Sequence, residues 1–438
     1  MPSAESPFDE VTERVRPAKA VPMVEEDEPE APPRPPVHWR PWVRGVLLVV
    51  GPLLAVLGIW WYFQPRGYHL LATYPSTSVL VIGSQQGFLL RELPNTFVLR
   101  DWARGTECWR VTTHLPIGFR VSYSLSPSGR YFAVLANNSL QAMVAVWDGG
   151  KEVITTSLSN ARTPVRLVKA LDDGRVFVWW TVAGHSEAQM LYAGQAQSGS
   201  VVAYGYARGQ LLPGNTADIA PDGKTMVAVR GNTFEYGTIA TEHGNITISH
   251  HYIGYDTVGS DAVPGYILNS NLFNNGKVLT SSGALYDQSG LVHAPTGWSH
   301  QYVNPNGNYV YQSRGNQARV YSPVTGEQWG FRVKGMHYGG DTTGEGRYAL
   351  AWFQPATPRL LNKIPFVQTL VGRWQRDTLA LYERPGRLRA ALRVDVSQWW
   401  NQRNSTPDEW WWWASPDGHS IVLNMTDGRQ SKALLFRW

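Results

Sequence analysis

Cysteine is nearly absent from the sequence, since Cys108 is the single cysteine among 438 residues. One thiol excludes an intramolecular disulfide framework, a cysteine-based zinc site and an iron–sulfur cluster. The eleven histidines form no ligand pattern, and the adjacent pair His250 and His251 would point to opposite faces of a strand. The motifs of a serine-hydrolase elbow, a zinc-protease helix and a P-loop are also missing. We therefore expect no metal site, no cofactor and no catalytic residues.

Charged residues are scarce, at 17% of the chain, and they are unevenly spread. Residues 1–42 hold five Lys or Arg, nine Asp or Glu and ten prolines. Because the whole chain has a net charge of +5, the remainder carries +9. The acidic run at residues 25–30 and the prolines after it cannot bury enough apolar surface to offset chain entropy. Residues 1–42 are therefore predicted to be a disordered tail.

Long apolar runs are also rare, and the one that stands out is the 18-residue segment Val46–Phe63, which carries no charge. Its length is close to the roughly 20 residues that a helix needs to cross a bilayer, and its aromatic end suits a membrane interface. We predict a single transmembrane helix within residues 43–65. A cleaved signal peptide is the main alternative, but bulky residues follow the run where cleavage needs small ones. A buried core helix is the third interpretation.

Basic residues are more frequent before the apolar run than after it. Arg34, Arg40 and Arg44 precede the run, and only Arg66 closely follows it. The positive-inside rule then places the tail in the cytoplasm and residues 66–438 in the periplasm or outside the cell. We expect the partners to be other membrane or envelope proteins and the membrane itself, and not nucleic acid.

Tight-turn sequences recur through residues 66–438. Seven segments place a polar residue before a glycine and then a short apolar run typical of a strand. They are SPSGRYFAVLA (126–136), LDDGRVFVWWT (171–181), APDGKTMVAVR (220–230), FNNGKVLTS (273–281), NPNGNYVYQSR (304–314), TGEGRYALAWF (343–353) and SPDGHSIVLNM (415–425). The glycines are 45, 49, 53, 31, 39 and 72 residues apart. Most spacings suit the roughly 40 to 50 residues of a four-stranded propeller blade, and the outliers indicate one short blade and one blade with an insertion.

A second hairpin often follows such a turn. The hairpins are predicted at residues 98–113, 145–158, 319–333 and 379–394. The pair SPSGRYFAVLA with VAVWDGGKEV, and the later turn SPDGH, resemble blades of WD40-like and TolB-like β-propellers. Only Trp147 and Asp148 reproduce the WD dipeptide. The resemblance covers most of residues 68–438 and implies a fold rather than a function.

The end of the chain supplies only three strands for its blade, at residues 410–414, 419–425 and 431–438. The segment Tyr68–Tyr74 can complete that blade. Together with six blades between Ile117 and Val396 and a less regular one at Ser76–Leu115, this predicts an all-β propeller of eight blades, or of seven if Ser76–Leu115 is irregular. The turns between first and second strands (the a–b face) would then lie toward the membrane, and the loops between second and third strands (the b–c face) away from it.

Features of propeller enzymes are weak. A sialidase-like Asp box is absent, and SPVTGEQW (322–329) faintly resembles one docking repeat of quinoprotein dehydrogenases, with Trp329 displaced by one position. The four tryptophans Trp410–Trp413 suit a buried inner strand better than a sugar-binding surface. A propeller enzyme, or a binder of a small carbohydrate-like ligand in the central channel, remains the alternative to a scaffold.

The main candidate for a functional site is an insertion at residues 354–377 in the penultimate blade, where most such loops need a few residues. Leu360, Ile364, Val367, Val371 and Trp374 recur at helical spacing beside basic side chains. This pattern indicates either docking of a partner or packing on the propeller rim. The candidate partner-binding residues are Arg359, Lys363, Val367, Val371, Arg373, Trp374, Arg376, Trp399 and Trp400. The sequence thus predicts a membrane-anchored, non-catalytic propeller that serves as a scaffold or accessory subunit.

Overall fold

The computed structural model divides the chain into two compact units, Met1–Trp61 and Tyr62–Trp438. It describes residues 50–52, 54, 67–77, 81–114, 120–137, 142–158, 167–182, 185–192, 201–204, 216–230, 233–242, 245–254, 272–279, 283–294, 296–304, 306–343, 345–356, 377–394, 409–426 and 431–438. In the first unit, residues 50–52 and 54 are helical. Within the described residues no helix is both long and apolar enough to span a membrane. The predicted membrane segment Val46–Phe63 lies mostly outside the described residues, and its membrane role stays a prediction.

The described part of the second unit forms eight antiparallel sheets, which we number in chain order. Sheet 1 contains β2 (Val81–Gly83), β3 (Gly87–Leu93), β4 (Thr96–Asp101) and β5 (Glu107–Thr112). Sheet 2 contains β6 (Arg120–Leu125), β7 (Tyr131–Asn137), β8 (Ala142–Asp148) and β9 (Lys151–Leu158). Sheet 3 contains β10 (Leu167–Ala170), β11 (Arg175–Val182), β12 (His185–Tyr192) and β13 (Val201–Tyr204). Sheet 4 contains β14 (Thr216–Ile219), β15 (Thr225–Arg230), β16 (Thr233–Glu242) and β17 (Asn245–Gly254).

The other four sheets follow the same plan, with two exceptions in strand number and order. Sheet 5 has three described strands, β18 (Val278–Leu279), β19 (Leu285–Asp287) and β20 (Gly290–His293). Sheet 6 contains β21 (Ser299–Val303), β22 (Val310–Arg314), β23 (Gln317–Tyr321) and β24 (Gln328–Arg332). Sheet 7 contains β25 (Gly335–Thr343), β26 (Tyr348–Pro355), β27 (Asp377–Glu383) and β28 (Arg387–Val394). Sheet 8 contains β29 (Glu409–Ala414), β30 (Ser420–Thr426), β31 (Ser431–Arg437) and, from the start of the unit, β1 (His69–Ser76).

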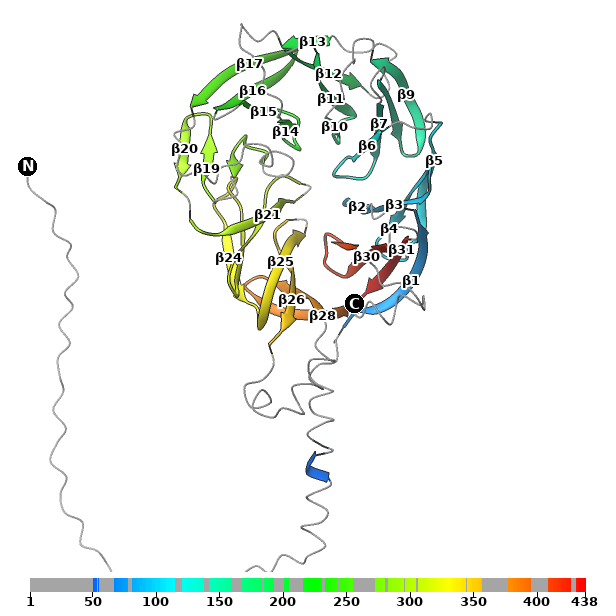
Figure 1. The fold of residues 1–438 in the computed structure, drawn as a ribbon, viewed down its shortest axis with the longest axis vertical. Helices are drawn as coiled ribbons and strands as arrows, with labels where there is room; N and C mark the ends of the chain where they lie inside the picture. The colour runs from blue at the N-terminus through cyan, green and yellow to red at the C-terminus, as the bar shows by residue number, and fades with distance from the viewer. Residues whose placement is uncertain are drawn as a thin grey trace, which may run out of the picture. The chain divides into compact units, whose positions relative to one another are not determined.

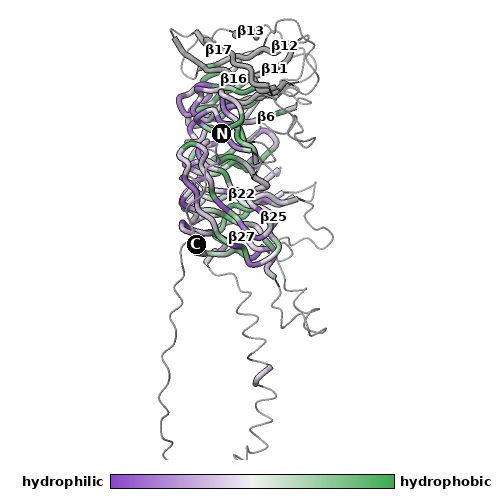
Figure 2. Tube along the Cα trace, turned by 90° about the vertical axis from the view of Figure 1, so that its left-hand side faces the viewer, coloured by the Kyte–Doolittle hydropathy of each residue, from purple (hydrophilic) through white to green (hydrophobic). Residues whose placement is uncertain are grey.

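The sheets follow one another around a central axis, with β2, β6, β10 and β14 nearest the axis in their sheets and β1 at the rim (Figure 1). Sheet 8 returns to sheet 1, where β2 contacts β29 and β1 contacts β3. Apolar clusters fill the space between neighbouring sheets, as in the cluster of Phe97, Phe132 and Trp147 between sheets 1 and 2. Figure 2 shows apolar segments along the strands and hydrophilic segments in the connecting turns. This arrangement is a β-propeller, so the predicted resemblance to WD40-like and TolB-like propellers is confirmed as a fold.

Six of the predicted glycine turns join the first and second strands of a sheet. The seventh, at Gly276, lies between Leu272, which bridges to Val278, and β18, and we count it as the a–b turn of sheet 5. All seven glycines have a positive φ, from 68° to 89°, and each donates its backbone N–H to the carbonyl three residues earlier. Glycine adopts this left-handed conformation without steric cost, which explains the recurrent sequence pattern. The segment Ser76–Leu115 is not irregular, since sheet 1 lies within it, and its β2–β3 hairpin turns at Gln85 and Gln86. The four predicted second hairpins are also present, as β4–β5, β8–β9, β23–β24 and β27–β28.

Side chains of one sheet also bind the a–b turn of the next sheet. The indole N–H of Trp109 in sheet 1 donates to the Gly129 carbonyl of sheet 2 at 3.2 Å. Trp329 of sheet 6 donates to the Gly346 carbonyl of sheet 7 at 2.7 Å. Trp329 therefore docks on its neighbour although its sequence position departs from the quinoprotein pattern. These bonds hold adjacent sheets in register.

Strand β1 completes sheet 8, as predicted from the sequence. It pairs antiparallel with β31 along its whole length, with one bulge between Leu70 and Ala72. Just before β1, the buried Tyr68 hydroxyl donates to the Gly418 carbonyl in the β29–β30 turn at 2.6 Å. Strand β1 therefore starts on the a–b face. The first and last strands of the propeller are joined in one sheet, which removes an open edge between them.

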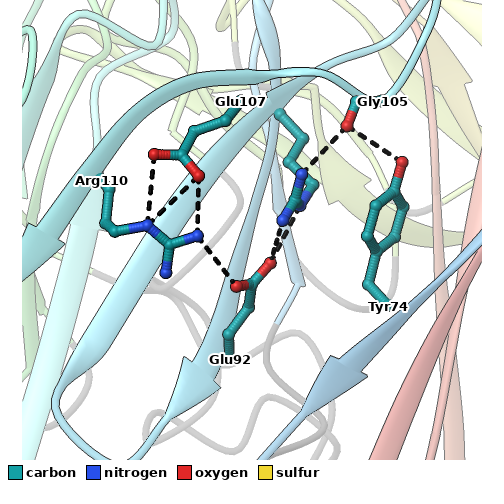
Figure 3. Close-up of polar contacts among 6 residues, drawn as sticks. Tyr74, Glu92, Gly105, Glu107 and Arg110 are labelled. Carbon is teal, nitrogen blue, oxygen red and sulfur yellow. Dashed lines mark hydrogen bonds and ion pairs between the residues drawn. The ribbon is translucent and has the colours of Figure 1, made fainter.

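A polar network fixes the seam between sheet 8 and sheet 1 (Figure 3). The Tyr74 hydroxyl of β1 donates to the Gly105 carbonyl at 3.0 Å, and Arg100 donates to the same oxygen at 3.1 Å. Glu92 accepts hydrogen bonds from both Arg100 and Arg110. The Arg100 guanidinium also lies 4.3 Å from the centre of the Tyr74 ring. The closing strand is thus held by side chains as well as by its ladder.

Candidate protein-interaction surface

The a–b turns converge on the axis and bind one another. Hydrogen bonds link the turns of sheets 1 and 2 through Gln85 and Pro127, and those of sheets 5 and 6 through Asn274 and Gly307. The Gln85 side-chain amide also donates to Asn306 Oδ1 at 3.1 Å. Because sheets 1 and 6 are not neighbours in the ring, this bond crosses the axis. The a–b end of the channel is therefore bridged by side chains.

The bridge has a cavity on either side. The smaller, about 30 Å³, lies among sheets 1, 6, 7 and 8 and is lined by Asp341, Thr343 and Trp413. The larger, about 390 Å³, opens among the turns of sheets 1 to 7, and its acidic lining residues are Asp172, Asp173, Asp222 and Glu345. Its lining includes no Arg or His among the described residues. Within the described part of the chain, no group of three His, Cys, Asp or Glu side chains could hold a metal ion.

Asp341 is the carboxyl group that lines the smaller cavity. Its side chain keeps contact with the small cavity but is otherwise surrounded by protein, and this burial raises its pKa to about 7. The Thr342 backbone N–H donates to Asp341 Oδ1 at 2.7 Å, which acts in the opposite direction. No second carboxyl or histidine lines the same cavity among the described residues, so the usual acid–base pair of a hydrolase is not assembled there.

The opposite face carries large apolar side chains at the starts of β25 and β29. Met336 is 65% exposed, Tyr338 is 40% exposed and Trp411 is 51% exposed. Tyr338 packs against Trp352 with ring centres 5.1 Å apart, and Trp352 meets Trp410 edge-on at 4.8 Å. We call these five residues the aromatic patch. Tyr338, Trp352 and Trp410 meet at the junction of sheets 7 and 8. Trp411 lies on the other face of β29, the face that carries Trp413 and is turned toward sheet 1, but at the same b–c end of the strand.

The aromatic patch lies at the base of the predicted insertion. Strand β26 ends at Pro355 and β27 begins at Asp377, so the long connection leaves and re-enters sheet 7 on the b–c face. Trp352 donates its indole N–H to Asp377 Oδ2 at 3.1 Å, and Tyr338 reaches Gln354. Burial beside the patch raises the pKa of Asp377, while the bond from Trp352 lowers it. Both ends of the insertion are therefore anchored to patch residues.

The candidate residues predicted from the sequence lie outside the described residues. They are Arg359, Lys363, Val367, Val371, Arg373, Trp374, Arg376, Trp399 and Trp400. Their role stays a prediction. The buried-strand interpretation of Trp410–Trp413 is right for three of the four rings, since Trp410 and Trp412 pack against sheet 7 and Trp413 against sheet 1. It is wrong for Trp411, which is half exposed because it lies beyond the part of sheet 1 that covers Trp413.

Sequence reasoning missed the other members of the patch. Met336 and Tyr338 alternate on the first strand of sheet 7, and Trp352 is the second-last residue of the predicted turn segment 343–353. The available signal in the sequence for these residues is that large side chains alternate just before the glycine pair Gly339 and Gly340. It could not show that Trp352 meets Trp410, because that contact depends on how sheets 7 and 8 pack.

Comparisons with known proteins found similarity to solved structures only. No family model matches the chain, and no curated protein matches its sequence. Among solved structures, the chain is similar to BamB from Moraxella catarrhalis, with 10% identity and a TM-score of 0.43 over 85% of this chain and 100% of that one. It is also similar to the Cps50 (Swd1) β-propeller domain from Myceliophteria thermophila, with 11% identity and a TM-score of 0.43 over 85% of this chain and 99% of that one. At this level of similarity the two structures indicate no ligand, partner or activity for this chain.

Proposed function

We propose that the protein is a membrane-anchored, non-catalytic β-propeller that acts as an interaction scaffold or accessory subunit of a membrane or envelope complex. The observation that carries the proposal is the aromatic patch. Exposed tryptophan, tyrosine and methionine side chains grouped on one face are typical of protein-binding surfaces. The patch also adjoins an insertion with an apolar helical stripe and basic residues. We infer that the two form one docking surface on the b–c face.

The proposed topology follows from the sequence around the start of the propeller. Residues 46–63 would cross the membrane, with residues 1–42 in the cytoplasm and residues 66–438 on the other side. In this proposal the eight sheets are eight blades of one closed ring. Because β1 starts on the a–b face, the chain enters the propeller there. The b–c face, with the aromatic patch, would then be the face available to partners.

A second candidate function uses the acidic cavity on the a–b face. The carboxylates of Asp172, Asp222 and Glu345 converge on a space of about 390 Å³, within the range of small-ligand sites. A small cationic or hydroxyl-rich ligand would suit that lining. Titration calorimetry on the purified protein would detect it, and replacing Asp222 with Asn would abolish the heat of binding.

Co-purification from solubilised membranes tests the scaffold proposal. The double variant Tyr338→Ala with Trp411→Ala removes two exposed rings of the patch, and the charge-reversal variant Arg373→Glu with Arg376→Glu changes the insertion. We expect each variant to lose the same partner proteins while keeping the wild-type melting temperature. For Tyr338 and Trp411 the reason is that exposed side chains contribute little to folding.

The matched control is Leu388→Ala. Leu388 is an exposed apolar residue of β28, in the same sheet as Tyr338 but on its outer strand. This variant should retain every partner. Retention of all partners by both test variants would place docking elsewhere and contradict the proposal, and unfolding of the charge-reversal variant would identify the insertion as a structural brace.

A further inference from the structure

A second, independent surface lies on sheet 6, on the face turned toward sheet 5. Antiparallel partners in neighbouring strands lie on the same face of a sheet, so the register defines the residues of this face. They are Val310, Gln312, Arg314, Gln317, Arg319, Tyr321, Gln328, Gly330 and Arg332. Three are arginines and none is acidic. The opposite face is apolar and packs against sheet 7.

The central cation of this face, Arg319, is half-buried, and no carboxylate among the described residues pairs with it. Its Nε donates to Gln312 Oε1 at 2.8 Å and its Nη1 to Gln328 Oε1 at 3.2 Å. The guanidinium lies 4.5 Å from the centre of the Trp298 ring and 5.4 Å from that of Tyr321. Among the described residues, no acceptor binds its Nη2 amino group. Burial lowers the pKa of Arg319, and the nearby Tyr321 side chain offsets this only in part.

An open pocket of about 530 Å³ adjoins this cation. Trp298 forms one wall, and the strands β23 and β24 form the floor. Gly330 stands opposite Arg319 in the ladder, so no side chain covers the backbone there. Arg332 lies on the same face, exposed and without an ion pair to any described residue. Strand β24 is the outer strand of its sheet, so its outer edge can pair with an added strand.

These features point to one kind of ligand. A guanidinium that is already partly desolvated and held by two amides loses little freedom on binding a carboxylate, and the planar group can bind it with two hydrogen bonds. An extended segment along β24 would place alternate side chains on the face that carries Arg319 and Arg332. We propose that this pocket binds an extended acidic segment of a partner protein, with one carboxylate on Arg319 and another near Arg332.

We infer that the acidic segment belongs to a partner protein and not to this chain. The chain's own acidic run, at residues 25–30, would be cytoplasmic in the proposed topology. The assignment of the segment to a partner rests on the proposed function. The binding of a carboxylate by Arg319 does not. A direct binding measurement on the purified full-length chain therefore tests the pocket without reference to the aromatic patch or the membrane.

The test is fluorescence polarisation with a labelled short peptide that alternates glutamate with valine and threonine, compared with the same peptide carrying glutamine in place of glutamate. We expect the acidic peptide to bind and the glutamine peptide not to bind. Arg319→Gln should weaken binding roughly 10- to 100-fold, the usual value of a charge-assisted hydrogen bond. Arg332→Gln should weaken it less, and rising salt should weaken it throughout.

The control is Arg104→Gln, which removes an exposed arginine from the β4–β5 turn of sheet 1. It should bind the acidic peptide like wild type. If Arg319→Gln lowers the melting temperature, Arg332→Gln serves as the variant that leaves the fold unchanged. Equal binding of the two peptides, or equal binding by wild type and both pocket variants, would overturn the proposal. Binding of inorganic phosphate but not of the acidic peptide would overturn it in favour of a small-anion site.

Discussion

Glu92 and Glu107 bind the same arginine but differ in their surroundings. The Glu92 side chain is 9% exposed and is shared by Arg100 and Arg110, whereas the Glu107 side chain is 39% exposed. Removing one partner from a buried ion pair leaves an uncompensated charge, while surface pairs contribute little. The network of Figure 3 therefore depends on Glu92.

We predict that Glu92→Gln lowers the free energy of unfolding by roughly 2–4 kcal/mol. The matched variant Glu107→Gln should change it by less than about 1 kcal/mol. Urea denaturation of the two variants and wild type checks the pair. Equal losses would show that the seam is held by its ladder alone.

Asp341 makes stability depend on pH. Its carboxyl ionises near pH 4 in the unfolded chain but with a pKa of about 7 in the fold, because burial penalises the charged form. The loss of unfolding free energy caused by burying the charged carboxylate is absent below about pH 4. It grows as pH rises to about 7 and is complete above that. Its ceiling is about 4 kcal/mol, because each tenfold change in the ionisation constant corresponds to about 1.4 kcal/mol.

Asp341→Asn keeps an oxygen for the Thr342 N–H but carries no charge, so it should become more stable than wild type as pH rises from about 4 to about 7. Thermal melts across this range measure the difference. The control Asp148→Asn should differ from wild type by a nearly constant amount across this range, because the hydrogen bond from Arg130 lowers the pKa of Asp148 and places its pH dependence below about pH 4. A pH-independent difference for Asp341→Asn would show that the carboxyl is solvated.

At the scale of strands and sheets, the most consequential element is β1. It supplies the outer strand of sheet 8 although it precedes sheet 1 in sequence. Without it, β31 would present an unpaired edge, and sheet 8 would lose the Tyr68 bond to its a–b turn.

We predict that a chain starting at Ser76 loses hydrogen-exchange protection first in β30 and β31, before sheets 2 to 7 are affected. Mass spectrometry of exchanged peptides resolves the two regions. Unchanged protection of residues 420–437 would contradict the closing role of β1.

The recurrent turns could be predicted because each requires a glycine at one position with positive φ, a local constraint visible in the sequence. The β2–β3 turn could not be predicted in this way, because Gln85 and Gln86 form a two-residue turn that has no glycine with positive φ. The aromatic patch could not be predicted from the sequence for a different reason. Its contact between Trp352 and Trp410 joins two sheets, and the pattern within one strand does not determine which side chains meet across sheets.

At the scale of the whole molecule, the proposed topology makes the two ends of the chain differ in accessibility. Residues 1–42 would be cytoplasmic and residues 66–438 would not. Protease added to intact cells or spheroplasts should then digest the propeller and leave the tail intact. Recovery of a soluble form starting near Gln64 would instead show that residues 46–63 belong to a cleaved signal peptide.

The two faces of the ring also differ in chemistry. The a–b face is bridged at its centre by Gln85 and Asn306 and is lined by carboxylates, while the b–c face exposes the aromatic patch beside the insertion. If the protein is a scaffold of the proposed kind, its partners bind the b–c face.

Site-specific photocrosslinking in cells tests this requirement most directly. A photoreactive amino acid is introduced in place of Trp411 on the b–c face or, in a separate strain, in place of Asp172 on the a–b face. We predict a discrete crosslinked protein adduct from position 411 and none from position 172. Adducts from position 172 alone, or from neither position, would contradict docking at the aromatic patch.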